Sequence, residues 1–141
     1  IGAILAKEHA ALFVPGDHGS TFGGNPLTCA AARATVQYLL DHKVTDHTLA
    51  MGKRLRRGLD ILATEFEGVV EIRGMGLLLA IQFRDNIAAD IVAASNEAGL
   101  LLNPVRPDTV RIMPPLTVAE SEIDEALQLL TQVLGKTIPN G

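Results

Sequence analysis

The sequence has 141 residues, of which 48% are hydrophobic and 20% charged, and its formal net charge is −4. This composition can build a sizeable core and excludes an intrinsically disordered chain, and the length suits one domain, or one domain and part of another. The acidic balance lacks the positive footprint expected of a protein that binds nucleic acid or an anionic membrane surface.

The only cysteine, Cys29, rules out an internal disulfide and favours a reducing compartment, which we expect to be the cytoplasm. It lies in an alanine-rich stretch without a catalytic pattern, so we interpret it as a packing residue rather than a nucleophile. The sequence has no apolar run long enough to span a bilayer and no signal-peptide pattern. We assign no residue to a metal site.

The first residues predict a short element that is already under way. The apolar run of residues 1–6 indicates a buried strand, and residues 7–12 indicate a short helix before a turn at residues 14–16. The opening has neither a methionine nor a capping residue, which fits a strand that is already under way.

Residues 17–27, with the sequence DHGSTFGGNPL, form a loop of small residues that leads into a helix. Asn25 is a good N-cap and Pro26 suits the first helical position. The loop glycines leave backbone amides uncovered, and Ser20 and Thr21 add hydroxyl groups. Two interpretations remain at this point: a tight turn before a helix, or a site for an anion, phosphate above all.

Two long helices are predicted next, the first from residue 26 to about 42 and the second over residues 46–66. The apolar stripe of the second helix consists of Leu55, Leu59, Leu62 and Phe66. Its other side carries a basic cluster, made of Lys53, Arg54, Arg56 and Arg57. A nucleic-acid patch is one interpretation of this cluster, but the acidic chain and the lack of interleaved aromatic residues favour a solvated helix face.

A small sheet is predicted after these helices. Residues 69–73 and 77–83 indicate two strands separated by glycines, and the second strand should be central because residues 76–81 are apolar on both faces. Asp85 or Asn86 should cap a further helix that ends at Gly99. A short strand at residues 100–102 should stop before Pro104.

The stretch of residues 109–113 predicts another strand, with Val110 and Ile112 on one face and Arg111 on the other. An arginine fixed in a strand presents a planar fork that suits a carboxylate, although a surface or ion-paired arginine is the alternative. Thr117 and Glu120 should form a capping box for the last helix. The apolar stripe of that helix consists of Ile123, Leu127, Leu130 and Leu134.

The predicted elements define the fold class as α/β. After the linking helix, helices should pack on one face of a small, mostly antiparallel sheet, which is an α+β arrangement. The periodicities define no function beyond this class.

Three stretches together resemble the class III aminotransferases, which depend on pyridoxal phosphate: HGSTFGGNPL followed by TCAAA, the words RGMGL, and VRIMPPLT. Within that class, the first stretch is most similar to the acetylornithine aminotransferases. The resemblance implies the C-terminal portion of a fold-type-I transferase. Residues 1–42 would then be the end of the large cofactor-binding domain with its linking helix, and residues 43–141 the small domain.

The resemblance also implies roles for individual residues. Thr21, with Ser20 beside it, would bind the phosphate of the neighbouring subunit's pyridoxal 5'-phosphate in a homodimer, and Arg111 would bind a substrate carboxylate. The lysine that forms the Schiff base would lie upstream of Ile1, because none of the four lysines has the family's context: Lys7, Lys43, Lys53 and Lys136. This chain should therefore hold no catalytic residue and should be inactive by itself.

The implied reaction of the parent enzyme is transfer of an amino group from N-acetylornithine to 2-oxoglutarate in arginine biosynthesis. Ornithine, 4-aminobutyrate and succinyldiaminopimelate stay open as amino donors, because substrate choice in the family depends largely on residues outside this sequence. A non-catalytic dimerisation or binding module is the alternative outside the enzyme class. We expect neither nucleic acid nor a membrane as a partner.

Overall fold

The computed structural model describes residues 1–138 and divides the chain into two units, Ile1–Lys43 and Val44–Gly141. The first unit contains a short 3₁₀ helix, η1 (Glu8–Ala10), and the helix α1 (Pro26–Asp41). All other elements belong to the second unit. Within the described residues, no helix is both long enough and apolar enough to cross a membrane.

The expected buried strand at residues 1–6 is wrong. These residues form no strand, and the side chains of Ile4 and Leu5 are 94% and 99% exposed. A strand needs a neighbour for its amide and carbonyl groups, and the first unit offers none among its described residues. The short helix predicted for residues 7–12 is confirmed only as η1.

The helix predicted from Pro26 onward is confirmed as α1. Its start follows from two residues: the side chain of Asn25 accepts a hydrogen bond from the Thr28 amide at 3.1 Å, and Pro26 occupies the first helical position. No residue of α1 is buried within this structure. The first unit therefore contributes a loop and a helix but no core of its own.

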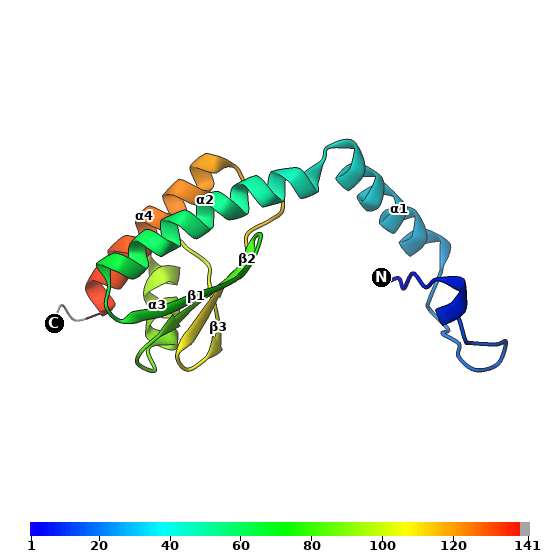
Figure 1. Cartoon of the computed structure of the whole chain (residues 1–141), viewed down its shortest axis with the longest axis horizontal. Coiled ribbons are helices and arrows are strands. Elements are labelled where there is room, and N and C mark those ends of the chain that lie inside the picture. The colour runs from blue at the N-terminus through cyan, green and yellow to red at the C-terminus, as the bar shows by residue number, and fades with distance from the viewer. Residues whose placement is uncertain (139–141) are drawn as a thin grey trace. The chain divides into compact units, whose positions relative to one another are not determined.

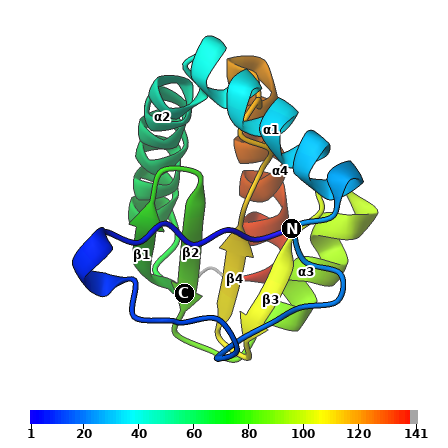
Figure 2. The same ribbon diagram turned by 90° about the vertical axis from the view of Figure 1, so that its right-hand side faces the viewer.

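The second unit is built from a four-stranded sheet and three helices. Its elements in chain order are α2 (Val44–Glu65), β1 (Val69–Met75), β2 (Leu78–Phe83), α3 (Ala88–Glu97), β3 (Asn103–Arg106), β4 (Thr109–Ile112) and α4 (Glu120–Thr137). The strand order is β1-β2-β4-β3, and each neighbouring pair is antiparallel (Figure 2). This confirms the predicted α+β arrangement, and β2 is central as expected.

All three helices cover the same face of this sheet (Figures 1 and 2). Leu79, Ile81 and Phe83 of β2 point toward the helices and are at most 3% exposed, whereas Ala80 and Gln82 between them are half-buried on the other face. The period of two in β2 thus divides the sheet into a core face and a face that no element of this unit covers among the described residues. We call the second one the open face.

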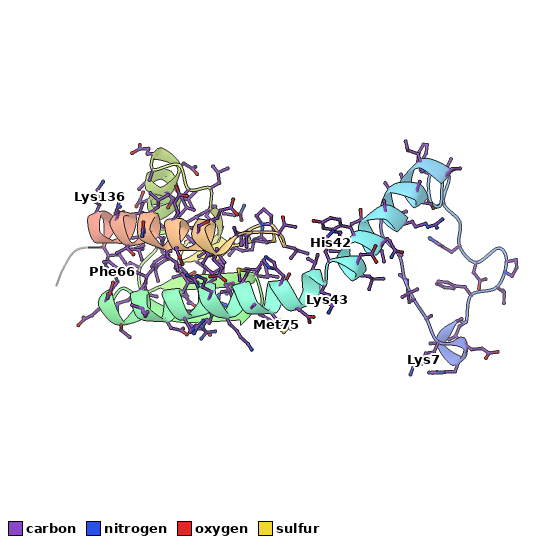
Figure 3. All side chains as sticks on the ribbon, turned by 90° about the horizontal axis from the view of Figure 1, so that it is seen from above. Lys7, His42, Lys43, Phe66, Met75 and Lys136 are labelled. Carbon is purple, nitrogen blue, oxygen red and sulfur yellow. The ribbon has the colours of Figure 1, made fainter. Side chains whose placement is uncertain are left out.

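The helices α2 and α4 run in the same direction, and Phe66 and Lys136, near their C-terminal ends, lie at the same end of the unit (Figure 3). Their approach is close at Gly58, where an added Cβ would lie 2.2 Å from Cδ1 of Leu127. Both predicted apolar stripes are confirmed, since Leu59 and Leu134 are fully buried in the shared core.

The strand expected at residues 100–102 is wrong, because the strand begins only at Asn103. Leu101 is 84% exposed, and β3 includes Pro104, which pairs with Val110 of β4. Proline is tolerated there because β3 is an edge strand, so the missing amide hydrogen faces no neighbour. The apolar run of residues 100–102 fills the connection from α3 instead of the sheet.

Two predicted helix caps are also wrong. The N-cap of α3 is Ile87, which has no side-chain cap. The N-cap of α4 is Ala119, whose backbone amide donates to the Glu122 carboxylate at 2.7 Å. A turn in which the Val118 amide bonds to the Pro115 carbonyl delays the start of α4, so the helix begins later than a capping box at Thr117 would place it.

Candidate functional site

One row of residues crosses the open face from edge to edge. Asn103 pairs with Arg111, Arg111 pairs with Ala80, and Ala80 pairs with Arg73, so the row contains one residue from each of the four strands. Paired residues share a face of an antiparallel sheet. Two arginine side chains therefore lie on the open face with one alanine between them.

The predicted orientation of Arg111 is confirmed. Val110 and Ile112 are buried in the core, at 0% and 8% exposure, whereas Arg111 is half-buried on the opposite face. Its Nη2 atom donates to the Asn103 side chain at 3.4 Å, which is long for a hydrogen bond. Its Nε atom is buried and has no hydrogen-bond partner among the described residues.

This environment bears on one alternative for Arg111, that of an ion-paired arginine. Within residues 1–138, no carboxylate lies at ion-pair distance from its guanidinium group, so the alternative of an ion-paired arginine has no partner to support it. A buried donor without an acceptor is destabilising unless a ligand or water satisfies it. The Arg111 guanidinium group keeps donors that could bond to an anion from outside this chain.

Arg111 borders a depression of about 420 Å³ on the open face. Apart from the two arginines, its lining is almost entirely apolar and consists of Gly74, Met75, Leu78, Leu79, Ala80 and Val105. An anion bound beside Arg111 would meet its guanidinium group in surroundings that weaken the competition from water. Such a depression suits a small molecule that carries a carboxylate.

A chain of hydrogen bonds beside this depression was not predicted from the sequence. Nη1 of Arg73 donates to Glu71 at 2.7 Å and to Gln82 at 2.6 Å. Gln82 donates to Asp108 at 2.8 Å, and Asp108 also accepts from the Thr109 hydroxyl at 2.8 Å. The bond from Thr109, followed by the one from Gln82, lowers the pKa of the Asp108 carboxyl below its ordinary value.

The structure places Ser20 and Thr21 in the exposed loop of the first unit. The Ser20 hydroxyl oxygen accepts a hydrogen bond from the Gly23 amide at 2.9 Å and can still donate its own hydrogen. The Thr21 hydroxyl has no partner among the described residues. Both hydroxyls are thus able to donate to an anion.

The N-terminus of α1 offers this loop fewer free backbone amides than the sequence suggests. Asn25 already occupies the Thr28 amide, and Pro26 has no amide hydrogen. Among the described residues, Leu27 therefore supplies the one unoccupied amide of the first turn. A phosphate at this loop would depend mainly on the hydroxyls of Ser20 and Thr21 rather than on the helix.

The basic cluster of α2 is partly neutralised by acidic side chains. Arg54 forms a two-pronged contact with Asp124 of α4, with distances of 2.8 and 2.7 Å, and a further bond to Glu120 at 2.9 Å. The bond from Arg54 lowers the pKa of Asp124, and the same pair raises that of Arg54. Arg56 pairs with Asp60 at 2.7 Å. The cluster thus links α2 to α4 through Arg54 and forms an ion pair within α2 through Arg56.

Together, the fold and the site define a small α+β unit whose open face carries Arg111 without a carboxylate partner among residues 1–138, joined in sequence to a hydroxyl-bearing loop before a helix. The chain belongs to the class III aminotransferases, since the family model "Aminotransferase class-III" matches residues 1–134. The resemblance implies the C-terminal portion of a fold-type-I transferase. This match and the solved structures described next confirm that fold.

Individual relatives agree with the family. An acetylornithine aminotransferase of Caldanaerobacter subterraneus subsp. tengcongensis is 46% identical over 136 residues, which cover 96% of this chain and 35% of the relative. The crystal structure of acetylornithine aminotransferase from Elizabethkingia anophelis matches 88% of this chain and 33% of its own, with a TM-score of 0.83 and 32% identity. Ornithine delta-aminotransferase of Plasmodium falciparum matches 95% and 36%, with a TM-score of 0.88 and 31% identity.

The chain thus spans about a third of the length of the relatives that it matches. Sequence identity and backbone similarity extend over both units, so the resemblance is not limited to one motif.

Proposed function

We propose that this chain is the C-terminal part of an aminotransferase that moves the amino group of N-acetylornithine to 2-oxoglutarate in arginine biosynthesis. The observation that carries the proposal is Arg111, whose guanidinium group lies on the open face without a carboxylate partner among residues 1–138 and with a buried Nε atom that has no acceptor. Both substrates of this reaction carry a carboxylate. The names of the similar proteins support the choice of reaction.

Arg111 binds and orients the substrate in this proposal. Its planar fork donates two parallel hydrogen bonds to a carboxylate, which fixes the direction of the substrate as well as holding its charge. The strand β4 keeps the side chain in place, because Arg111 lies between the buried residues Val110 and Ile112. A fixed donor reduces the entropy that is lost when the substrate is bound.

The parent of a class III chain uses pyridoxal 5'-phosphate, and the loop fits one part of a phosphate site. The Thr21 hydroxyl is exposed and unoccupied among the described residues, and Ser20 keeps a free hydroxyl hydrogen. When bound, the cofactor supplies an electron sink for the carbon that exchanges its amino group. Thr21 and Ser20 would donate hydrogen bonds to the phosphate of the partner subunit's cofactor, which makes the parent a homodimer.

In this proposal residues 1–42 belong to the large cofactor-binding domain and residues 43–141 to the small domain. The amine that reacts with the cofactor would come from the part of the parent upstream of Ile1. The 141-residue chain by itself should therefore show no transaminase activity. The cytoplasmic location favoured by the single cysteine stays a prediction.

The test is an activity panel on the full-length protein, with N-acetylornithine, ornithine, 4-aminobutyrate and succinyldiaminopimelate as amino donors and 2-oxoglutarate as acceptor. We expect the highest kcat/KM with N-acetylornithine. Ornithine is the second candidate, favoured by the structural match to the Plasmodium falciparum enzyme. An active enzyme that prefers another donor overturns the assignment of the substrate, and a protein that is inactive with all four donors overturns the assignment of the reaction.

The cofactor role of the loop has its own test in the full-length protein. Thr21→Ala should weaken retention of the cofactor by roughly 10- to 100-fold, because a hydrogen bond to a charged group contributes about 1.5–3 kcal/mol. Thr64→Ala, which alters an exposed threonine at the end of α2, is the matched control. Equal cofactor affinity in both variants would remove Thr21 from the phosphate site, and an active strict monomer would contradict its action across subunits.

A further inference from the structure

A second cavity, of about 450 Å³, lies between α2 and the β1–β2 hairpin. The helix α2 runs beside β1 (Figure 2), and its side of the cavity consists of Leu49, Gly52, Lys53, Arg56 and Arg57. Residues three and four positions apart share a face of a helix, so one face of α2 supplies all five. The volume falls in the range of sites that bind small molecules.

The hairpin side of this cavity presents backbone and apolar surface. It consists of Gly74, Gly76 and Leu79. The two glycines have φ angles of +125° and +57°, which favour glycine, and without side chains they allow a ligand to approach the backbone closely. Across from them, Leu49 of α2 is 54% exposed. The cavity therefore offers an apolar surface to the body of a ligand.

The four cations of the basic cluster differ in their partners. Arg54 is bound to two acidic residues of α4, and Arg56 donates to Asp60 within α2. By contrast, Lys53 and Arg57 form no ion pair with any carboxylate of residues 1–138. The one hydrogen bond of the Arg57 side chain in that range runs from its Nε atom to the Lys53 carbonyl, at 3.3 Å. Two exposed cations at the cavity are thus not neutralised by this unit.

The spacing of these two cations indicates the kind of anion that suits them. Lys53 and Arg57 are four positions apart on α2, and like charges at this spacing repel each other. Among the described residues, the lining contains no acidic side chain that would offset the repulsion. A phosphate monoester carries close to two negative charges near neutral pH and three acceptor oxygens on one group, so it can bond to both cations at once. A carboxylate carries one charge and matches them less well.

We propose that this cavity binds a small-molecule phosphate monoester. Lys53 and Arg57 hold the phosphate, and the apolar body of the ligand lies against Leu49 and the hairpin glycines. Arg56 contributes less, because Asp60 already accepts from its Nε atom. The site uses neither Arg111 nor the loop of Ser20 and Thr21, so this inference does not depend on the proposed function.

The test measures binding by calorimetry on the full-length protein carrying its cofactor, with phenyl phosphate, inorganic phosphate and phenylacetate as probes. Phenyl phosphate should bind more tightly than the other two. Lys53→Gln and Arg57→Gln should each weaken its binding about tenfold, as expected for the loss of a charged hydrogen bond. Leu49→Ser should weaken the binding of phenyl phosphate and leave that of inorganic phosphate unchanged. Arg84→Gln is the control, since it removes an exposed arginine that bonds to the Glu67 carbonyl and does not line the cavity.

Several results would overturn the proposal. If Lys53→Gln and Arg57→Gln change phenyl phosphate affinity by less than about twofold, or by no more than Arg84→Gln does, the probe is bound elsewhere. If inorganic phosphate binds as tightly as phenyl phosphate, the cavity attracts anions through its charge alone. If phenylacetate binds as tightly, the site does not select phosphate. Both cations are exposed, so we expect both variants to fold, and if circular dichroism shows that one does not, the other decides.

Discussion

Replacing Gly52 with alanine should destabilise the second unit although alanine is the better helix former. Gly52 is buried in α2 where the helix crosses the end of the β1–β2 hairpin, and an added Cβ would lie 2.6 Å from the carbonyl carbon and oxygen of Gly76 and 2.7 Å from its Cα. These atoms are backbone, and Gly76 has a φ of +57°, so no side-chain rotation relieves the overlap.

The expected size follows from two opposing effects. Glycine to alanine within a helix stabilises by about 1 kcal/mol. Overpacking a tight contact typically costs about 1–3 kcal/mol, and the rigid partner at Gly76 places Gly52→Ala at the upper end. The net loss is about 1–2 kcal/mol, which corresponds to a fall in melting temperature of roughly 5–15 °C for a unit of this size.

Thermal unfolding followed by far-ultraviolet circular dichroism measures this difference, with Gly135→Ala as the matched control. Gly135 lies in α4, and its added Cβ would meet only Phe66 at 3.9 Å, an ordinary contact distance. The control should keep or slightly raise the melting temperature. If Gly52→Ala is as stable as the control, the hairpin yields easily and the reasoning from this close approach is wrong.

Three further changes test other parts of the structure. Arg111→Lys keeps the charge but loses the planar fork, so kcat/KM of the full-length enzyme with 2-oxoglutarate should fall by about one to two powers of ten; normal kinetics would make the residue structural. The lowered pKa of Asp124, caused first by its bond from Arg54, stabilises the fold above the ordinary aspartate value of 3.8, and this stability is lost as the pH falls through the lower folded-state value. The urea midpoint of Asp124→Asn should therefore be lower than that of the wild type near neutral pH and should decline less in acid, and an identical pH profile would contradict this linkage. The Ser95 hydroxyl is buried without a partner among the described residues. Ser95→Ala should therefore leave the free energy of unfolding in urea unchanged or raise it by up to about 1 kcal/mol. A clear loss of stability would reveal an unrecognised hydrogen bond.

The features predicted correctly from the sequence are those that a local period determines. The spacing of Leu55, Leu59 and Leu62 identifies the buried stripe of α2, and the alternation around Arg111 places its side chain on the open face. These predictions need only the geometry of one helix or strand, because the face that is buried follows from the residues of the element itself.

The wrong predictions depend on partners that are distant in the sequence. Residues 1–6 have the composition of a strand, but no other segment of the first unit pairs with them. The start of β3 at Asn103 depends on its pairing with Arg111, which the apolar run before it does not indicate. The start of α4 at Glu120 likewise depends on the turn between Pro115 and Val118.

The candidate site shows the same division. Motif resemblance names Arg111, Thr21 and Ser20 as site residues, which stay predictions, but the neighbourhood of Arg73 was not predicted. Gln82 and Asp108 are 26 positions apart and meet only because β2 and β4 are neighbours in the sheet. No local pattern encodes that contact, so the position of Arg73 beside the depression became visible only in the folded unit.

Both borders of the small sheet carry an irregularity that limits how this chain can associate. The pairing of β1 shifts between Val69 and Glu71, and that of β3 shifts between Pro104 and Arg106, with a proline in the outer strand. Bulges and prolines at an edge obstruct the addition of another strand. Copies of the isolated chain should therefore not lengthen the sheet into ribbons. Any clustering should instead involve the apolar side chains of the first unit, such as Leu5 and Phe13, which are 99% and 81% exposed.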